Sequence, residues 1–313
     1  EGELDYPNAI LIGEVTDGED SELTINGKKF DIFELMDVNS ARFAQVYPDT
    51  AEAYNQKLAP AGLEGVKPYK AKKADLKYKG EPVEKPIAYL PVFPGTNCDY
   101  DSAKAFRTAG AEVRMSVFCN LTEDDIFRSI AEMKKNIDEC HILMLSGGFS
   151  AGDEPDGSGK FIANVLNNKE IADAIHALID RGGLILGICN GFQALVKSGL
   201  LPYGRLGMVT KESPTLFRND INRHISQIVT TRVGTTNSPW LKGFAIGDLH
   251  TIAVSHGEGK FVVNEELAKE LFANGQVAFQ YVDPIDEEVT MESPYNPNGS
   301  YYAIEGIISR NGQ

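Results

Sequence analysis

A cysteine between two glycines is the feature of this sequence best suited to chemistry. The apolar run LILG at 184–187 predicts a buried strand, Cys189 follows almost at once, and a helical pattern begins at residue 191. Gly187 and Gly191 permit a tight strand-to-helix turn that exposes the Cys189 side chain. We therefore expect a nucleophile elbow in which the dipole of the following helix favours the thiolate. The alternative is a buried structural cysteine, although core packing alone does not need flanking glycines.

A thiol nucleophile needs a base, and the sequence offers five histidines. His256 ends an apolar run and precedes Gly-Glu-Gly, so from the residues alone it is the candidate base, with Glu258 as the group that orients it. The histidines at 141, 176 and 224 are most simply structural or solvated. His250 and His256 lie too far apart for one metal ion unless the chain bends, and no metal site is predicted.

Composition and charge exclude several classes of function. The 313-residue chain carries 45 acidic and 30 basic side chains, a net charge of −15, so a nucleic-acid-binding surface is not expected. No apolar run approaches the ~20 residues of a membrane span, and the first residues do not resemble a signal peptide. The four cysteines show no C-x-x-C pairing, which predicts free thiols in a reducing compartment. We expect a cytoplasmic protein with no membrane or nucleic-acid partner.

Alternating strands and helices must position the cysteine. Strands are predicted at 86–93, 111–118, 141–146 and 184–187, and helices at 101–110, 123–137 and 169–183. This alternation predicts an α/β fold, with a mostly parallel sheet and helices on both faces. Sites on such sheets lie at the carboxyl ends of the strands, where the Cys189 turn and the loops that begin at residues 94 and 146 fall.

The pattern is mixed beyond residue 202. Strands are predicted at 227–233, 251–256, 260–263, 276–282 and 301–309, with one helix at 265–273. We expect an extension of the parallel sheet together with a smaller antiparallel layer.

The start of the chain forms a separate small unit. Strands at 9–16 and 22–32, the second with an Asn26-Gly27 turn, predict a β-rich segment that precedes the main fold, and helical spacing follows at 41–48. Residues 1–66 are too few to bury a domain core, and the Lys- and Pro-rich segment 67–85 predicts a linker. The predicted division is therefore 1–66, 67–85 and a main domain at 86–313.

Four motifs carry a family resemblance. They are PGTNCDYD at 94–101, SGGFSAGDEPDGSGKF at 146–161, GICNGFQ at 187–193 and SHGEGKF at 255–261. In this order they resemble the triad-type (class I, flavodoxin-like) glutamine amidotransferases, and among these the glutaminase domain of phosphoribosylformylglycinamidine synthase. The resemblance covers about residues 86–313.

The resemblance implies a role for each motif. Cys189 is the nucleophile that attacks glutamine, and Gly147, Gly148 and Phe149 form an oxyanion strand that works with the N–H of Asn190. Gln193 lies one helical turn beyond Cys189, where its amide can orient the substrate, although from its position alone it is better explained as a surface residue. His256 lines the pocket, and weaker candidates around it are Gly95, Thr96, Asn97, Arg218 and Asn219.

The family also implies chain beyond both ends of this sequence. Its His-x-Glu pair, the base and its orienter, follows the segment that corresponds to residues 301–313, and this sequence stops before that motif. A chain without the pair is expected to be a poor glutaminase by itself. Residues 1–66 resemble the tail of the upstream synthetase domain of the long, single-chain enzyme. We therefore expect the sequence to be a fragment that lacks the C-terminal end of the glutaminase domain.

The implied reaction is glutamine hydrolysis to glutamate and ammonia. The ammonia converts formylglycinamide ribonucleotide to formylglycinamidine ribonucleotide in de novo purine biosynthesis. No G-x-x-x-x-G-K-[ST] loop occurs, so ATP and Mg are expected in the separate synthetase domain and no cofactor in this one. Three alternatives stay open: a glutaminase that serves another acceptor, a binding or regulatory module that is inactive because the His-x-Glu pair is absent, and a thiol-dependent redox or chaperone protein.

Overall fold

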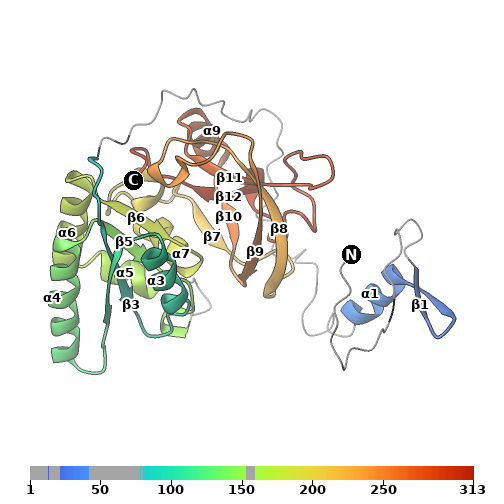
Figure 1. Cartoon of the computed structure of the whole chain (residues 1–313), viewed down its shortest axis with the longest axis horizontal. Helices are drawn as coiled ribbons and strands as arrows, with labels where there is room; N and C mark the ends of the chain where they lie inside the picture. Colours follow the sequence, from blue (N-terminus) through green and yellow to red (C-terminus); the bar gives the residue numbers. More distant parts are fainter. Residues whose placement is uncertain (1–12, 14–21, 42–77, 79, 153–158) are drawn as a thin grey trace. The chain divides into compact units, whose positions relative to one another are not determined.

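The computed structural model describes residues 13, 22–41, 78, 80–152 and 159–313 (Figure 1). The chain divides into two units, Glu1–Asp49 and Thr50–Gln313. Nearly all of the strand expected at 9–16, of the helix expected at 41–48 and of the first part of the predicted linker lies outside the described residues. The division at 66 and 85 therefore stays a prediction. Among the described helices, none is both long and apolar enough to cross a membrane.

The first unit contains the predicted hairpin. Strands β1 (Glu22–Ile25) and β2 (Lys28–Asp31) pair antiparallel across Asn26 and Gly27. Both turn residues have positive φ, 50° and 77°, as a two-residue hairpin turn of this type requires. A helix that the sequence did not predict, α1 (Ile32–Ala41), follows directly. The Asp31 carboxylate accepts hydrogen bonds from the N–H groups of Phe33 and Glu34 and so caps its first turn.

The second unit begins with the predicted parallel sheet. Its strands are arranged in the order β4-β3-β5-β6, and every neighbouring pair is parallel. The elements in chain order are β3 (Ile87–Val92), α3 (Asp99–Thr108), β4 (Glu112–Val117), α4 (Glu123–Glu139), β5 (Ile142–Leu145), η1 (Ser150–Gly152), α5 (Lys160–Leu166), α6 (Lys169–Asp180), β6 (Leu184–Gly187), α7 (Asn190–Ser198) and α8 (Leu200–Tyr203). The α/β fold class is confirmed. The short helix α5 was missed by the sequence analysis.

Helices cover both faces of this sheet. On one face, Tyr89, Leu143 and Leu145 pack against apolar residues of α4 and α6, which lie side by side in Figure 1. On the other face, Ala88, Leu90 and Met144 pack against Ala103 and Phe106 of α3. Strand residues alternate between these two cores, as the period of a strand requires. Burial on both faces explains why the strands are continuous apolar runs.

The chain after α8 forms antiparallel sheets. A four-stranded sheet has the order β12-β11-β8-β9, and β10 pairs with β7. The elements are β7 (Thr215–Phe217), β8 (Ile225–Val233), η2 (Pro239–Leu241), β9 (Leu249–His256), β10 (Lys260–Val262), α9 (Glu265–Ala273), β11 (Val277–Val282), η3 (Tyr301–Ala303) and β12 (Ile304–Ile307).

The expected extension of the parallel sheet is wrong for the described part of the chain. Within it, no strand after β6 joins that sheet, and the antiparallel sheet has as many strands as the parallel one. The reason is that β8 and β9 are long and pair with each other along eight residues, so the mixed segment builds its own layer.

Candidate active site

Cys189 occupies the turn between β6 and α7 in a strained backbone conformation. Its φ is 53° and its ψ is −110°, a combination that is unfavourable for every residue except glycine. The residue stands at the N-cap of α7 and its side chain is exposed. The nucleophile elbow expected from the sequence therefore has its predicted geometry, with the thiol at the positive end of a helix dipole. The four cysteines are all free thiols, as predicted.

The two flanking glycines serve close packing rather than the positive φ. A Cβ on Gly191 would overlap the carbonyl oxygen of Leu145 in β5. A Cβ on Gly187 would lie 2.6 Å from Leu195 Cδ1 and 2.7 Å from the backbone of Gly191. Helix α7 can thus begin directly against the ends of β5 and β6, and this leaves Cys189 itself to adopt the strained angles.

The loop after β5 faces the cysteine through Gly147. A Cβ built on Gly147 would lie 3.4 Å from Cys189 Cβ and 3.9 Å from Sγ, in van der Waals contact with the cysteine side chain. The Gly147 carbonyl accepts a hydrogen bond from the Asn97 N–H at 2.8 Å. Gly148 has a φ of 129°, and a Cβ there would overlap the Asn97 nitrogen. The 94–98 loop therefore braces the glycines of the predicted oxyanion strand.

Phe149 has a different place in this loop. Its N–H donates to the Gly95 carbonyl at 2.8 Å, and its side chain is exposed. A backbone N–H that is already paired contributes little to an oxyanion site, so the backbone at Gly147 and Gly148 is the part of this loop suited to that role.

Asn190 and Gln193 are buried and bonded to each other. The Asn190 side chain accepts from the Ser150 N–H at 3.2 Å and donates through Nδ2 to Gln193 Oε1 at 2.9 Å. Gln193 Nε2 donates to the carbonyl of Glu258 at 2.7 Å. The sequence-based alternative that Gln193 is a surface residue is wrong, because α7 packs into the core along this face. These two amides connect the loop after β5, helix α7 and the turn after β9.

His256 lies at the end of β9, and its imidazole is held by an amide. Its Nδ1 is 3.2 Å from Asn219 Oδ1. The sequence suggested Glu258 as the group that orients His256; the structure places the Asn219 amide at Nδ1 of the ring, and the Glu258 backbone carbonyl accepts from Gln193. Burial, with a smaller effect of nearby His224, lowers the pKa of His256, so the ring is neutral at neutral pH.

The other histidines have structural surroundings. His141 Nδ1 accepts from the Ile87 N–H and His176 Nε2 from the Leu206 N–H, each at 3.1 Å, which confirms their structural role. His224 Nε2 lies 2.9 Å from the Ser255 hydroxyl. His250 packs between the rings of Phe244 and Phe279. In the described part of the chain, no cluster of three or more His, Cys, Asp or Glu side chains is arranged to hold a metal ion.

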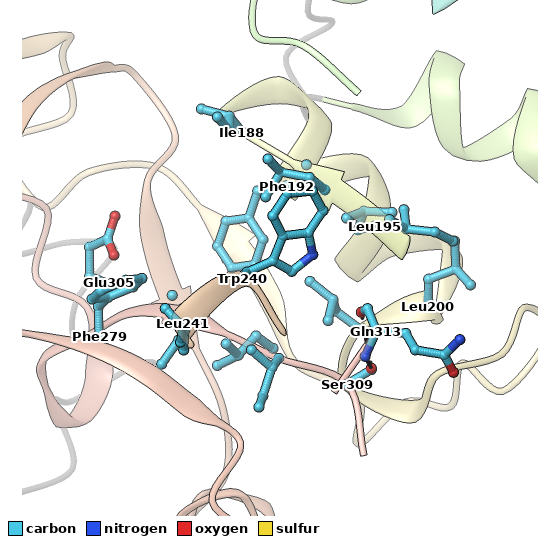
Figure 2. Close-up of a pocket in the computed structure, with 18 of the residues that line it drawn as sticks. Ile188, Phe192, Leu195, Leu200, Trp240, Leu241, Phe279, Glu305, Ser309 and Gln313 are labelled. Carbon is cyan, nitrogen blue, oxygen red and sulfur yellow. Dashed lines mark hydrogen bonds between the residues drawn. The ribbon is translucent and has the colours of Figure 1, made fainter. Parts of the chain in front are cut away.

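A cavity of about 510 Å³ opens beside Cys189, between β6 and α7 on one side and β11, β12 and η2 on the other. Phe192 and Trp240 both line this cavity, and in the view of Figure 2 Leu195 and Leu200 lie on one side of them and Phe279 and Glu305 on the other. Cys189 itself lines the cavity, and its Sγ lies 4.0 Å from the carbonyl oxygen of Ser255 in β9. The thiol is thus bordered by the glycine loop, the end of β9 and an apolar cavity.

Comparison with known proteins agrees with this geometry. Residues 85–313 match the family described as CobB/CobQ-like glutamine amidotransferase domain. A relative in Methanococcus maripaludis strain C5, phosphoribosylformylglycinamidine synthase subunit PurQ, is 35% identical over 221 residues, which are 70% of this chain and 76% of the relative. The PurQ subunit of Gloeobacter violaceus is 33% identical over 221 residues, 71% of this chain and 82% of that protein.

A solved structure supports the same assignment. The structure of PurLQS from Thermotoga maritima superimposes with a TM-score of 0.51 at 28% identity, and the match covers 73% of this chain and 84% of that one. A family match over most of the chain, relatives above 30% identity and a cysteine in a nucleophile elbow all agree. This chain belongs to the CobB/CobQ-like glutamine amidotransferase family, and it is a glutamine amidotransferase of the PurQ type.

Proposed function

We propose that this chain supplies Cys189 as the nucleophile of glutamine hydrolysis, and that the ammonia released converts formylglycinamide ribonucleotide to formylglycinamidine ribonucleotide in purine biosynthesis. The observation that carries the proposal is the Cys189 elbow, with φ at 53° at the start of α7 and Gly147 in contact with its side chain. Relatives named as PurQ subunits of phosphoribosylformylglycinamidine synthase support the acceptor.

The chemistry follows from this arrangement. The Cys189 thiolate attacks the side-chain amide carbon of glutamine, and backbone N–H groups of the Gly147-Gly148 loop and Asn190 stabilise the oxygen of the tetrahedral intermediate. The carbon–nitrogen bond then breaks, the nitrogen takes up a proton and leaves as ammonia, and a glutamyl thioester remains on Sγ. Water adds to the thioester, the carbon–sulfur bond breaks, and glutamate and the thiol are released.

The partner and cofactors follow from the same proposal. A synthetase domain or subunit takes up the ammonia and carries out the ATP- and Mg-dependent step, since the sequence contains no phosphate-binding loop. The glutaminase domain itself uses no cofactor and no metal, binds neither nucleic acid nor membrane, and works in the cytoplasm. The alternative of a binding or regulatory module with a spectator cysteine is not favoured by the relatives, which are named as subunits of an enzyme.

A labelling experiment tests the proposal. The protein is incubated with a glutamine analogue that bears a diazoketone, and its intact mass and the modified residue are determined. We expect one adduct on Cys189, slowed by added glutamine and absent in Cys189→Ser. The exposed thiols of Cys98 and Cys119 serve as internal controls. Equal labelling of these two thiols, or no protection by glutamine, would contradict a glutamine-reading nucleophile.

A further inference from the structure

Asn219 lies in the segment between β7 and β8 and is 1% exposed. Its side-chain amide bonds to the turn that follows β9. Its Nδ2 donates to the carbonyl oxygens of His256 at 2.7 Å and Arg223 at 3.0 Å, and its Oδ1 accepts from the Gly259 N–H at 3.0 Å. Its own backbone N–H donates to the Gly257 carbonyl at 3.1 Å. One residue thus bonds to the backbone of three of the four residues in the 256–259 turn.

The same amide determines the tautomer of His256. An amide oxygen only accepts hydrogen bonds, so the 3.2 Å contact with Asn219 Oδ1 requires that Nδ1 of His256 carries the proton. In the neutral ring, Nε2 is then the atom with the free lone pair. A Cβ on Gly259 would overlap the imidazole, so the ring lies against the turn and has little freedom to rotate. The proton and the ring orientation are therefore both set by Asn219 and its turn.

This turn adjoins the nucleophile and the helix that follows it. The carbonyl of Ser255, the residue before the turn, lies 4.0 Å from Cys189 Sγ, and the Glu258 carbonyl within the turn accepts from Gln193 of α7 at 2.7 Å. A displacement of the turn is therefore expected to move the backbone groups that contact Cys189 and Gln193. The side-chain bonds of Asn219 go to the turn and to the Arg223 carbonyl, so an effect of its side chain on the reaction is expected to pass through the turn.

We propose that Asn219 is a positioning residue for the glutamine site: it sets the Nδ1–H tautomer of His256 and holds the 256–259 turn in place beside Ser255, which contacts Cys189. This inference rests on the proposed glutaminase function.

The charges around His256 bear on the test. His224 acts electrostatically on the ring, and the segments that Asn219 connects also carry Arg223, Glu258 and the ion pair between buried Lys260 and Asp220. Lys260 is 2% exposed at its side chain, and its ammonium is paired with the Asp220 carboxylate. In Asn219→Asp a carboxylate would replace the amide beside Nδ1 of His256. Its negative charge would favour the protonated imidazolium form of the ring.

Two substitutions test the proposal against a matched control. Asn219→Asp keeps the shape but loses the Nδ2 donors and adds a charge at Nδ1 of His256. Asn219→Ala removes the whole contact. The control is Asn296→Asp, because Asn296 is also buried at 2% exposure but bonds to Ser300 and Met291 in its own loop, not to His256. All variants are first compared with the parent chain by thermal unfolding.

The readouts separate positioning from general structural damage. For Asn219→Asp, the pH profile of Cys189 labelling by the diazoketone glutamine analogue is expected to move by about one pH unit or more to higher pH, while Asn296→Asp keeps the parent profile. For Asn219→Ala, protection by glutamine is expected to weaken at least tenfold, while labelling of Cys189 by iodoacetamide changes less than twofold.

Every other outcome of these experiments would contradict either this proposal or the proposed function. An unchanged pH profile in Asn219→Asp, or the same shift in Asn296→Asp, would overturn the proposal. Equal losses of glutamine protection and of iodoacetamide labelling in Asn219→Ala would show a purely structural role and overturn it as well. A parent chain that reacts with iodoacetamide but not with the glutamine analogue would instead contradict the proposed function itself.

Discussion

Glu305 offers a quantitative test of the cavity beside Cys189. This residue belongs to β12, and Figure 2 shows its carboxyl group near Phe279 on the side of the cavity opposite Leu195. Burial in these surroundings raises the pKa of Glu305 from 4.5 to about 7. The carboxyl group is therefore largely protonated in the folded protein at a pH where the unfolded chain has it ionised.

The sign and size of the effect on stability follow from this shift. Because the pKa of Glu305 is higher in the folded state, its unfavourable contribution is absent below pH 4.5 and grows as the pH rises to about 7. The difference between the folded and unfolded pKa values of Glu305 corresponds to a loss of about 3 kcal/mol at most in the free energy of unfolding. Glu305 is only partly buried, and solvent in the cavity reduces the effect. We expect ionised Glu305 to lower the free energy of unfolding by about 1 to 3 kcal/mol above pH 7.

Glu305→Gln isolates this contribution, because the amide has nearly the same shape and does not ionise. The free energy of unfolding of both chains is measured by urea denaturation at several values between pH 4.5 and 8.5. We expect equal stabilities at the lowest pH and a growing advantage of Glu305→Gln as the pH rises. A difference that is constant with pH would show that the carboxyl group has an ordinary pKa and that the cavity does not desolvate it.

Two further predictions concern the elbow. Gly191→Ala should lower the free energy of unfolding by about 1 to 3 kcal/mol and slow Cys189 labelling at least tenfold, because the new Cβ overlaps the Leu145 carbonyl. Gly243→Ala, at a site with open space around it, is the control, and equal effects in urea denaturation would contradict the packing argument. Cys189→Gly should be more stable than Cys189→Ala by about 1 to 2 kcal/mol, since glycine adopts a φ of 53° without strain. Equal urea midpoints for these two variants would refute strain at the nucleophile.

Most of the secondary structure was predictable because its signals are local. The strand at 184–187 and the helix at 265–273 have the predicted bounds, and the helix expected at 123–137 extends only to Glu139. The apolar pattern lies within each of these elements, and both helices are also preceded by a capping residue, Thr122 and Asn264. Helix α5 was not predicted because its seven residues are too few to show a clear helical period, and because it follows a glycine-rich segment.

The partners of the polar site residues could not be predicted in the same way. Gln193 was expected to contact substrate or solvent, yet its amide bonds to the Glu258 carbonyl 65 residues away. Asn190 bonds to the Ser150 N–H, which lies 40 residues earlier in the sequence. Buried amides must pair with whatever the fold brings near them, and no spacing rule describes such pairs.

The sequence by itself determined the α/β class, the elbow around Cys189 and the glycine loop that faces it, because strand and helix periods and the steric needs of glycine are properties of short segments. Only the tertiary structure decided that the later strands form their own antiparallel sheet and that Asn219 holds the ring of His256, 37 residues further along the chain. Both outcomes depend on which segments pack together. That choice is made by the burial of the whole chain and not by any one stretch of it.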